Sequence, residues 1–267
     1  MRLSGAILSS SLMLLASAGL CRAQSSITNV LNGASFAAGQ PVTGGSLISI
    51  FGTNLASGVA SADTIPLSTS LGGVIVQFEN GDTRIQAPIL FVQPTQLNVQ
   101  VPWGLVPPGT SATVHMVVNS NGNLPSTDVQ VGPFSPGVFA SNGLAVAVNF
   151  SDGTLAWPVN KVPGLTTHPA KPGDTLVIYA TGLGAVDHTP ADGNNTGTQL
   201  ATNLVTPQVL IGGVTANVIF SGLSPQFVGV NQLNVTVPNV APGDSLPLVI
   251  KLGGITSPDT TTIAVTQ

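Results

Sequence analysis

The chain has 267 residues, of which 6% are charged, and its formal net charge is −4. Ordinary soluble proteins carry about a quarter charged residues, so the surface here must consist largely of uncharged polar side chains. Beyond residue 23 the only cations are Arg84, Lys161, Lys171 and Lys251. Four scattered cations cannot form a basic patch, which excludes a nucleic-acid partner.

Residues 1–23 are predicted to be a secretory signal peptide. Arg2 supplies the positive start, an apolar stretch spans residues 7–20, and Cys21 and Ala23 are small residues that suit signal peptidase. The apolar run is too short, and too rich in Ser and Gly, for a stable membrane anchor. We therefore expect an exported protein, periplasmic, cell-surface or extracellular, that begins at Gln24.

The single cysteine leaves one alternative for this segment. A lipoprotein would carry lipid on Cys21, but Leu20 stands where lipid attachment requires a small residue. Cleavage after Ala23 would remove Cys21, so the mature chain would have neither a disulfide nor a thiolate site.

A duplication organises the remaining sequence. Residues 96–102 return as residues 232–238, with apolar residues at odd positions of the first copy and Gln or Asn between them. This alternation is typical of a strand with one face in a core, and it places Val99 and Val235 inward and Gln100 and Thr236 outward. Three more blocks recur in the same order: 45–55 with 173–183, 71–74 with 211–214, and 108–109 with 242–243.

The duplication predicts two all-β domains in tandem, at residues 24–133 and 134–267. Val, Ile, Thr and Phe dominate the short apolar runs, which favours strands. Turn residues such as Asn80-Gly81 and Asp152-Gly153 separate neighbouring strands. A linker at residues 131–139 carries two Phe, which we expect to anchor it between the domains.

The second domain contains a longer loop than the first, residues 187–204 against 56–65. Long loops on rigid scaffolds are frequent binding sites. Asp187, Asp192, Asn194 and Asn195 could offer oxygen ligands to Ca²⁺, although their spacing differs from that of an EF-hand loop. Capping of the loop's own backbone is the alternative interpretation.

Catalytic motifs are absent from the sequence. His115 lies in an alternating strand, His168 precedes Pro169 in a loop, and Asp187 and His188 are adjacent, so an extended chain would point them in opposite directions. No Ser lies in a Gly-x-Ser-x-Gly elbow. We predict no catalytic residue, no metal ligand and no cofactor site.

Trp103 and Trp157 permit two interpretations. An exposed indole can stack on a sugar ring and donate a hydrogen bond. Each Trp also adjoins a Pro, and packing against a loop or the other domain would explain both equally.

The repeated blocks resemble the Solibacter-type uncharacterised C-terminal domain found in exported acidobacterial proteins, and each half is more weakly similar to IPT/TIG immunoglobulin-like domains. The resemblance covers residues 27–267 and implies export and an immunoglobulin-like fold, with no assigned activity. The residues that carry it are 45–55, 96–103, 179–184, and 228–229 before 232–235.

The sequence therefore predicts an exported, non-enzymatic pair of immunoglobulin-like β-sandwiches. Its role would be interaction or structural support, with an unidentified protein or glycan partner outside the cytoplasm. The alternative is a carbohydrate-binding module that uses an exposed Trp and residues 187–204. A third possibility, an enzyme of unrecognised type, would require a His and a carboxylate, or two carboxylates, to converge in a pocket.

Overall fold

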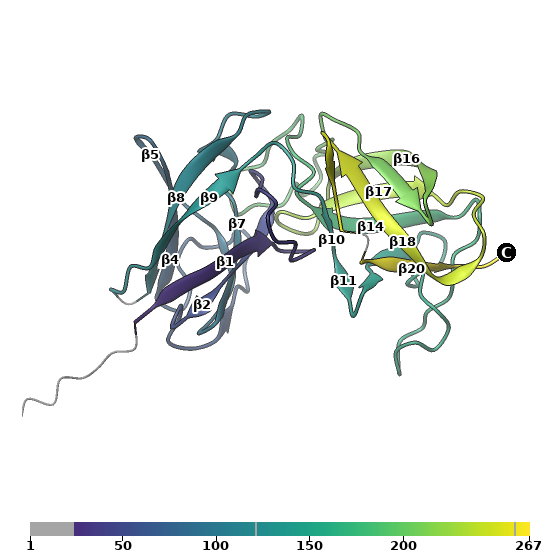
Figure 1. Ribbon diagram of the computed structural model, residues 1–267, viewed down its shortest axis with the longest axis horizontal. Helices are drawn as coiled ribbons and strands as arrows, with labels where there is room; N and C mark the ends of the chain where they lie inside the picture. The colour runs from purple at the N-terminus through teal and green to yellow at the C-terminus, as the bar shows by residue number, and fades with distance from the viewer. Residues whose placement is uncertain (1–23, 121, 259) are drawn as a thin grey trace, which may run out of the picture.

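The alternating segments form two β-sandwiches in the computed structural model, which describes residues 24–120, 122–258 and 260–267 (Figure 1). The predicted signal peptide, residues 1–23, lies outside the described residues. One 3₁₀ turn, η1 (Trp103–Leu105), interrupts the strands. Within the described ranges, no helix has the length and hydropathy needed to cross a membrane.

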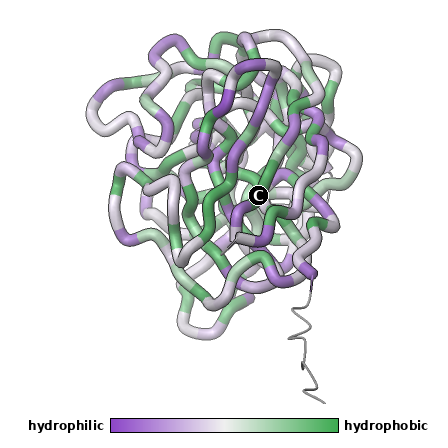
Figure 2. The backbone as a smooth tube through the Cα atoms, turned by 90° about the vertical axis from the view of Figure 1, so that its left-hand side faces the viewer, coloured by the Kyte–Doolittle hydropathy of each residue, from purple (hydrophilic) through white to green (hydrophobic). Residues whose placement is uncertain are grey.

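The first sandwich consists of a five-stranded and a four-stranded antiparallel sheet, in the orders β1-β2-β7-β6-β3 and β5-β4-β8-β9. Side chains alternate between core and solvent along these strands, which Figure 2 displays as changing hydropathy along the tube. Its strands are β1 (Ser26–Asn32), β2 (Leu47–Thr53), β3 (Ala60–Ser61), β4 (Val74–Asn80), β5 (Thr83–Gln86), β6 (Ile89–Gln93), β7 (Gln96–Gln100), β8 (Ala112–Ser120) and β9 (Ser126–Val131).

The second sandwich is one sheet that wraps around its own core, in the order β10-β14-β17-β16-β15-β18-β20-β12-β11, with β13 paired to β14 and β19 to β18. Its strands are β10 (Gly137–Val138), β11 (Ala140–Ser141), β12 (Leu144–Ala145), β13 (Ala147–Asn149), β14 (Thr175–Thr181), β15 (Gln208–Ile211), β16 (Val214–Leu223), β17 (Asn231–Thr236), β18 (Gly243–Leu252), β19 (Ile255–Thr256) and β20 (Thr262–Val265).

Two separate hydrophobic clusters fill the sandwiches. The buried residues of the first cluster run from Val42 to Val131, and those of the second from Val138 to Val265. The predicted division between residues 133 and 134 falls in the stretch that separates them. In this stretch Phe134 packs against the second cluster, and its ring lies where a Cβ on Gly184 or Gly253 would be.

The duplication seen in the sequence is also a duplication of strand register. Ile48 lies opposite Val99 between β2 and β7, and Leu176 lies opposite Val235 between β14 and β17. All four side chains are fully buried. The prediction that Val99 and Val235 occupy matching core positions is confirmed.

The predicted turn residues close the expected hairpins. β4 and β5 pair through Asn80 and Thr83, and Gly81 between them has a φ of 57°, a backbone conformation that Gly adopts without steric cost. Asp152 and Gly153 turn the chain after β13, where the N–H of Asn149 donates to the carbonyl of Thr154.

Candidate functional site

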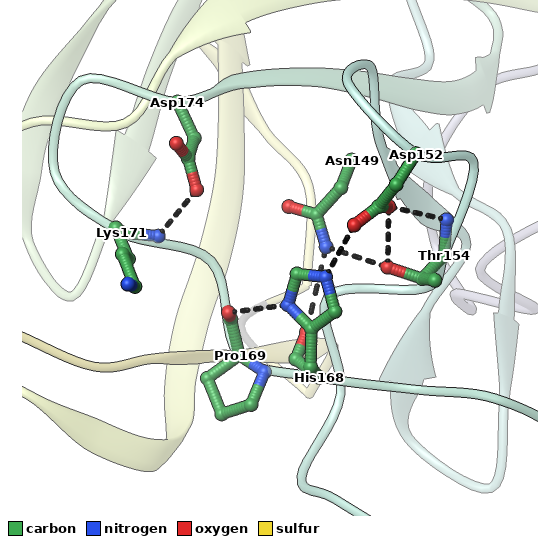
Figure 3. Close-up of polar contacts among 7 residues, drawn as sticks. All are labelled: Asn149, Asp152, Thr154, His168, Pro169, Lys171 and Asp174. Atoms are coloured by element: carbon green, nitrogen blue, oxygen red, sulfur yellow. Dashed lines mark hydrogen bonds and ion pairs between the residues drawn. The ribbon is translucent and has the colours of Figure 1, made fainter.

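The most developed polar cluster surrounds His168, in the loop that precedes β14 (Figure 3). His168 Nε2 lies 2.6 Å from Asp152 Oδ2, and His168 Nδ1 lies 2.9 Å from the carbonyl oxygen of Pro169. The hydroxyl of Thr154 donates to Asp152 Oδ1 at 2.7 Å. Asn149 Nδ2 completes the cluster with contacts to the Thr154 hydroxyl and the His168 carbonyl.

Both ring nitrogens of His168 face acceptors, so both contacts are hydrogen bonds when the ring is a doubly donating imidazolium. The hydrogen bond to Asp152 raises the pKa of His168, and the same bond, together with those from Thr154, lowers the pKa of Asp152 to about 2. A general base needs an imidazole nitrogen free to accept a proton. The Pro169 carbonyl occupies the second nitrogen, and the contact between His168 and Asp152 joins two loops.

The other two histidines also pair with aspartates. His115 Nδ1 lies 2.9 Å from Asp128 Oδ1 across β8 and β9, and both side chains are exposed. His188 Nδ1 lies 3.1 Å from Asp187 Oδ1. The expectation that Asp187 and His188 point in opposite directions is wrong, because they lie in a bend and not in an extended strand.

Residues 187–204 include a segment of the second sandwich that forms hydrogen bonds with the first. Asp192 Oδ1 accepts a hydrogen bond from the backbone N–H of Trp103 at 2.9 Å. The N–H of Gly193 donates to Gln100 Oε1 at 2.7 Å, and its carbonyl accepts from the N–H of Leu67 at 2.9 Å. We call these contacts of Asp192 and Gly193 the loop latch. Three groups of the first sandwich are thus bound by two consecutive residues of the second.

The latch overturns the prediction that Gln100 faces solvent. Its side chain is fully buried, with Nε2 donating to the carbonyl of Gly45 at 3.4 Å and Oε1 accepting from Gly193. The alternation of residues 96–102 correctly places Gln100 on the face that points away from the core of its own sandwich. The second sandwich covers that face, and alternation within one strand contains no information about such a neighbour.

Neither Trp is a fully exposed indole, and burial of Trp157 removes it from the predicted sugar site. Trp157 is 4% exposed, and its Nε1 donates to the carbonyl of Ala145. Trp103 is half-buried and packs on a small cluster of second-sandwich residues, Val186, Ala201 and Leu223. Its ring also fills the space that a Cβ on Gly45 would need.

Two further buried polar side chains connect the sandwiches. Thr181 Oγ1, at the end of β14, accepts from the N–H of Leu47 at 2.9 Å and donates to the carbonyl of Gly229 at 2.7 Å. Asn32 Nδ2, at the end of β1, donates to the carbonyl of Ser135 at 2.6 Å. Thr181 and Asn32 are at most 2% exposed, so these bonds form in a desolvated junction, where leaving a polar group unpaired is costly.

The oxygen-bearing residues of the loop form hydrogen bonds with the loop's own backbone, with the connection between β16 and β17, and with the first sandwich. Asp187 Oδ1 accepts from the N–H of Thr202 at 2.7 Å, a bond that lowers the pKa of this carboxyl, and Asn195 Nδ2 donates to the carbonyl of Gln226 at 3.3 Å. Burial raises the pKa of the Asp192 carboxyl. Within the described residues, no three His, Cys, Asp or Glu side chains gather as a potential metal site.

The comparisons with known proteins concern the fold alone. No protein-family model and no curated protein sequence matches the chain. Similar solved structures include Dpr2 Ig1-Ig2 in complex with DIP-Theta Ig1-Ig3, with 8% identity over 91% of this chain and 99% of that one and a TM-score of 0.24. A titin structure has 11% identity over 86% of this chain and 97% of that one, with a TM-score of 0.23.

Longer proteins also align with the chain. It covers 34% of the plexin A4 extracellular region, with 91% of this chain aligned, 9% identity and a TM-score of 0.23. It covers 40% of invasin, a bacterial integrin-binding protein, with 91% of this chain aligned, 11% identity and a TM-score of 0.20. The strand order and register define the class of protein, which is a tandem pair of immunoglobulin-like β-sandwiches.

Sequence reasoning placed the long loop correctly but missed both the latch and the His168 cluster. Asp152 and His168 are 16 residues apart and meet only because the hairpin after β13 folds toward the segment before β14. Asp192-Gly193 has the composition of an ordinary turn. The one available signal was Gln100, a long amide at the end of a strand where its counterpart in the repeat is the shorter Thr236.

Proposed function

We propose that this chain is an exported, non-enzymatic module whose two immunoglobulin-like sandwiches present a fixed surface for interaction or structural support outside the cytoplasm. The resemblance of its repeated blocks to the Solibacter-type domain is part of this proposal and agrees with export. The observation that supports it most is the junction between the sandwiches. There the buried side chains of Gln100, Thr181 and Asn32 form hydrogen bonds that hold one sandwich against the other.

The arrangement of titratable groups supports the non-enzymatic part of the proposal. All three histidines pair with an aspartate, and the pair with the shortest contact has both imidazole nitrogens occupied. Contact surfaces of interaction modules depend on rigid shape, because ordering a mobile surface on binding reduces affinity. A fixed junction between two sandwiches provides that rigidity.

Expression of the full chain in a bacterial host tests export and activity together. We expect the protein outside the cytoplasm with Gln24 as its first residue, determined by mass spectrometry, and no turnover in a panel of hydrolase substrates. An intact Met1 in the cytoplasmic fraction would contradict export. Hydrolase activity that disappears in His168→Asn would contradict the non-enzymatic assignment.

A further inference from the structure

An aromatic and amide face recurs in both sandwiches. In the second sandwich, Tyr179 lies opposite Gln232 between β14 and β17, and Phe220 lies opposite Asn234 between β16 and β17. Directly opposed residues of neighbouring strands share a face, as do residues two apart in one strand. These four half-buried side chains therefore project from one side of the sheet, while Leu233 between the amides faces the core.

The first sandwich repeats this face residue for residue. Phe51 lies opposite Gln96 between β2 and β7, and Phe91 lies opposite Asn98 between β6 and β7. A register irregularity precedes the second aromatic in both copies, between Ile89 and Phe91 and between Val218 and Phe220. A β-bulge changes the direction of the side chains beside it, so the same irregularity orients Phe91 and Phe220.

A third ring flanks each face. The ring centroids of Phe36 and Phe51 are 6.0 Å apart. Those of Phe227 and Tyr179 are 6.1 Å apart, with an angle of 84° between the ring planes. The two flanking rings are 49% and 50% exposed. They come from unrelated loops outside the repeated blocks, yet each places an exposed ring beside the first aromatic of its face.

The amides are held in one orientation with hydrogen-bonding capacity left over. Gln232 Nε2 donates to Asn234 Oδ1 at 2.9 Å, and Gln96 Nε2 donates to Asn98 Oδ1 at 2.8 Å. Within the described part of the chain, the carbonyl oxygens of both Gln side chains and the amino groups of both Asn side chains have no protein partner. Each face thus offers fixed donors and acceptors beside aromatic rings.

The second sandwich adds a wall to its face. Phe220, Gln232 and Asn234 line a groove of about 430 Å³ whose other side is formed by residues 196–200 of the long loop. No charged side chain lines this groove. Small-ligand sites combine apolar and aromatic surface with a few oriented polar groups, and this groove has both.

We propose that the aromatic and amide face of the second sandwich binds an uncharged polysaccharide. The C–H faces of neighbouring sugar rings in one chain would pack on Phe220 in the groove and on Tyr179 and Phe227 on the other side of β17. Their hydroxyls would exchange hydrogen bonds with Gln232 and Asn234. The matching face of the first sandwich offers the same groups without the wall and is the weaker of two sites on one rigid unit. This inference rests on the proposed interaction role and differs from the tryptophan hypothesis, because neither Trp takes part.

The lining chemistry favours this occupant over two others. An anionic polysaccharide would gain from cations, and none lines the groove. An apolar peptide would bury the unpaired amide groups without satisfying them, which costs free energy. Sugar hydroxyls both donate and accept hydrogen bonds, so they match amides that have one free acceptor oxygen and two free donor hydrogens side by side.

Affinity electrophoresis of the chain from Gln24 onward tests the proposal, with mixed-linkage β-glucan, xylan and galactomannan as neutral probes and alginate as the anionic probe. We expect at least one neutral probe to retard the protein and alginate not to. Phe227→Ala and the double variant Gln232→Ala/Asn234→Ala should each weaken retardation about tenfold or more. Phe150→Ala is the matched control, because Phe150 is 71% exposed and lies outside both faces.

Phe36→Ala separates the two faces and should reduce retardation less than Phe227→Ala. Thermal unfolding verifies that each variant folds. Absence of retardation by all three neutral probes, retardation by alginate alone, or unchanged retardation in the double variant would overturn the proposal. Binding to an isolated bacterial envelope fraction distinguishes the two levels of inference: envelope binding without polysaccharide binding rejects the glycan site and leaves the interaction module standing.

Discussion

β7 and β17 are the same strand of a duplicated sandwich, but their last residues have different surroundings. Gln100 is fully buried and bonded to two glycines, one from each sandwich, whereas Thr236 is half-buried between its own neighbours Thr175 and Asn217. Val99 and Val235, one position earlier, are equally buried. The duplication therefore preserves what each core requires and diverges where the two copies meet.

The largest expected effect tests the preserved half of this comparison. Val99→Ala and Val235→Ala should each reduce the free energy of unfolding by about 2 kcal/mol, because each removes buried methyl groups and leaves a cavity. Urea denaturation measures both. A cost below about 0.5 kcal/mol at either position would show that the two strands do not contribute equivalent core residues.

The next residue along each strand, Gln100 or Thr236, differs between the two copies, so truncating it should change the free energy of unfolding by different amounts. Gln100→Ala should cost about 1–2 kcal/mol, because the buried N–H of Gly193 loses its acceptor. Thr236→Ala should change the free energy of unfolding by no more than about 0.5 kcal/mol. Equal losses of unfolding free energy in the two variants, measured in the same urea experiment, would contradict the different surroundings of Gln100 and Thr236.

The fold was predictable from the sequence because its signals are local. Alternation in residues 96–102 and the turn at Asn80 and Gly81 each depend on neighbours within a few residues. The junction was not predictable in the same way. Gln100 and Gly193 are 93 residues apart, and a strand pattern states which face is polar without stating what covers that face.

The latch can be tested through its carboxylate. Asp192→Ala removes the acceptor of the Trp103 backbone N–H and should lower the free energy of unfolding by about 1 kcal/mol. Asp192→Asn keeps an acceptor oxygen and removes a partly buried charge, so it should cost less or stabilise the protein at neutral pH. Greater destabilisation by Asn than by Ala would contradict the role assigned to this side chain.

The sign of the Asp192 pKa shift gives a further check. Burial raises its pKa in the folded state above the ordinary value of 3.8, so the folded chain binds this proton more tightly than the unfolded chain. The ionised Asp192 carboxylate therefore destabilises the fold at neutral pH. The free energy of unfolding should increase as pH falls through the pKa of the folded state. This gain should be absent in Asp192→Asn.

The smallest effect concerns the His168 cluster, which joins two loops within one sandwich. The raised pKa of His168 stabilises the fold below its ordinary value of 6.5, and this contribution is lost as pH rises through the folded pKa. The lowered pKa of Asp152 stabilises the fold above 3.8, and this contribution is lost as pH falls through about 2. The difference in melting temperature between wild type and His168→Gln should therefore be greatest between pH 3.8 and 6.5. A difference that does not vary with pH would contradict the ion pair.

The central claim is that the two sandwiches form one rigid unit, and the distance between them tests it most directly. The chain from Gln24 onward has no cysteine, so spin labels can be attached through Asp82→Cys in the first sandwich and Asp244→Cys in the second, both exposed. Double electron–electron resonance should give one narrow distance distribution, which broadens when Gln100→Ala and Asp192→Ala are combined. A broad distribution in the chain with an intact latch would contradict the rigid junction.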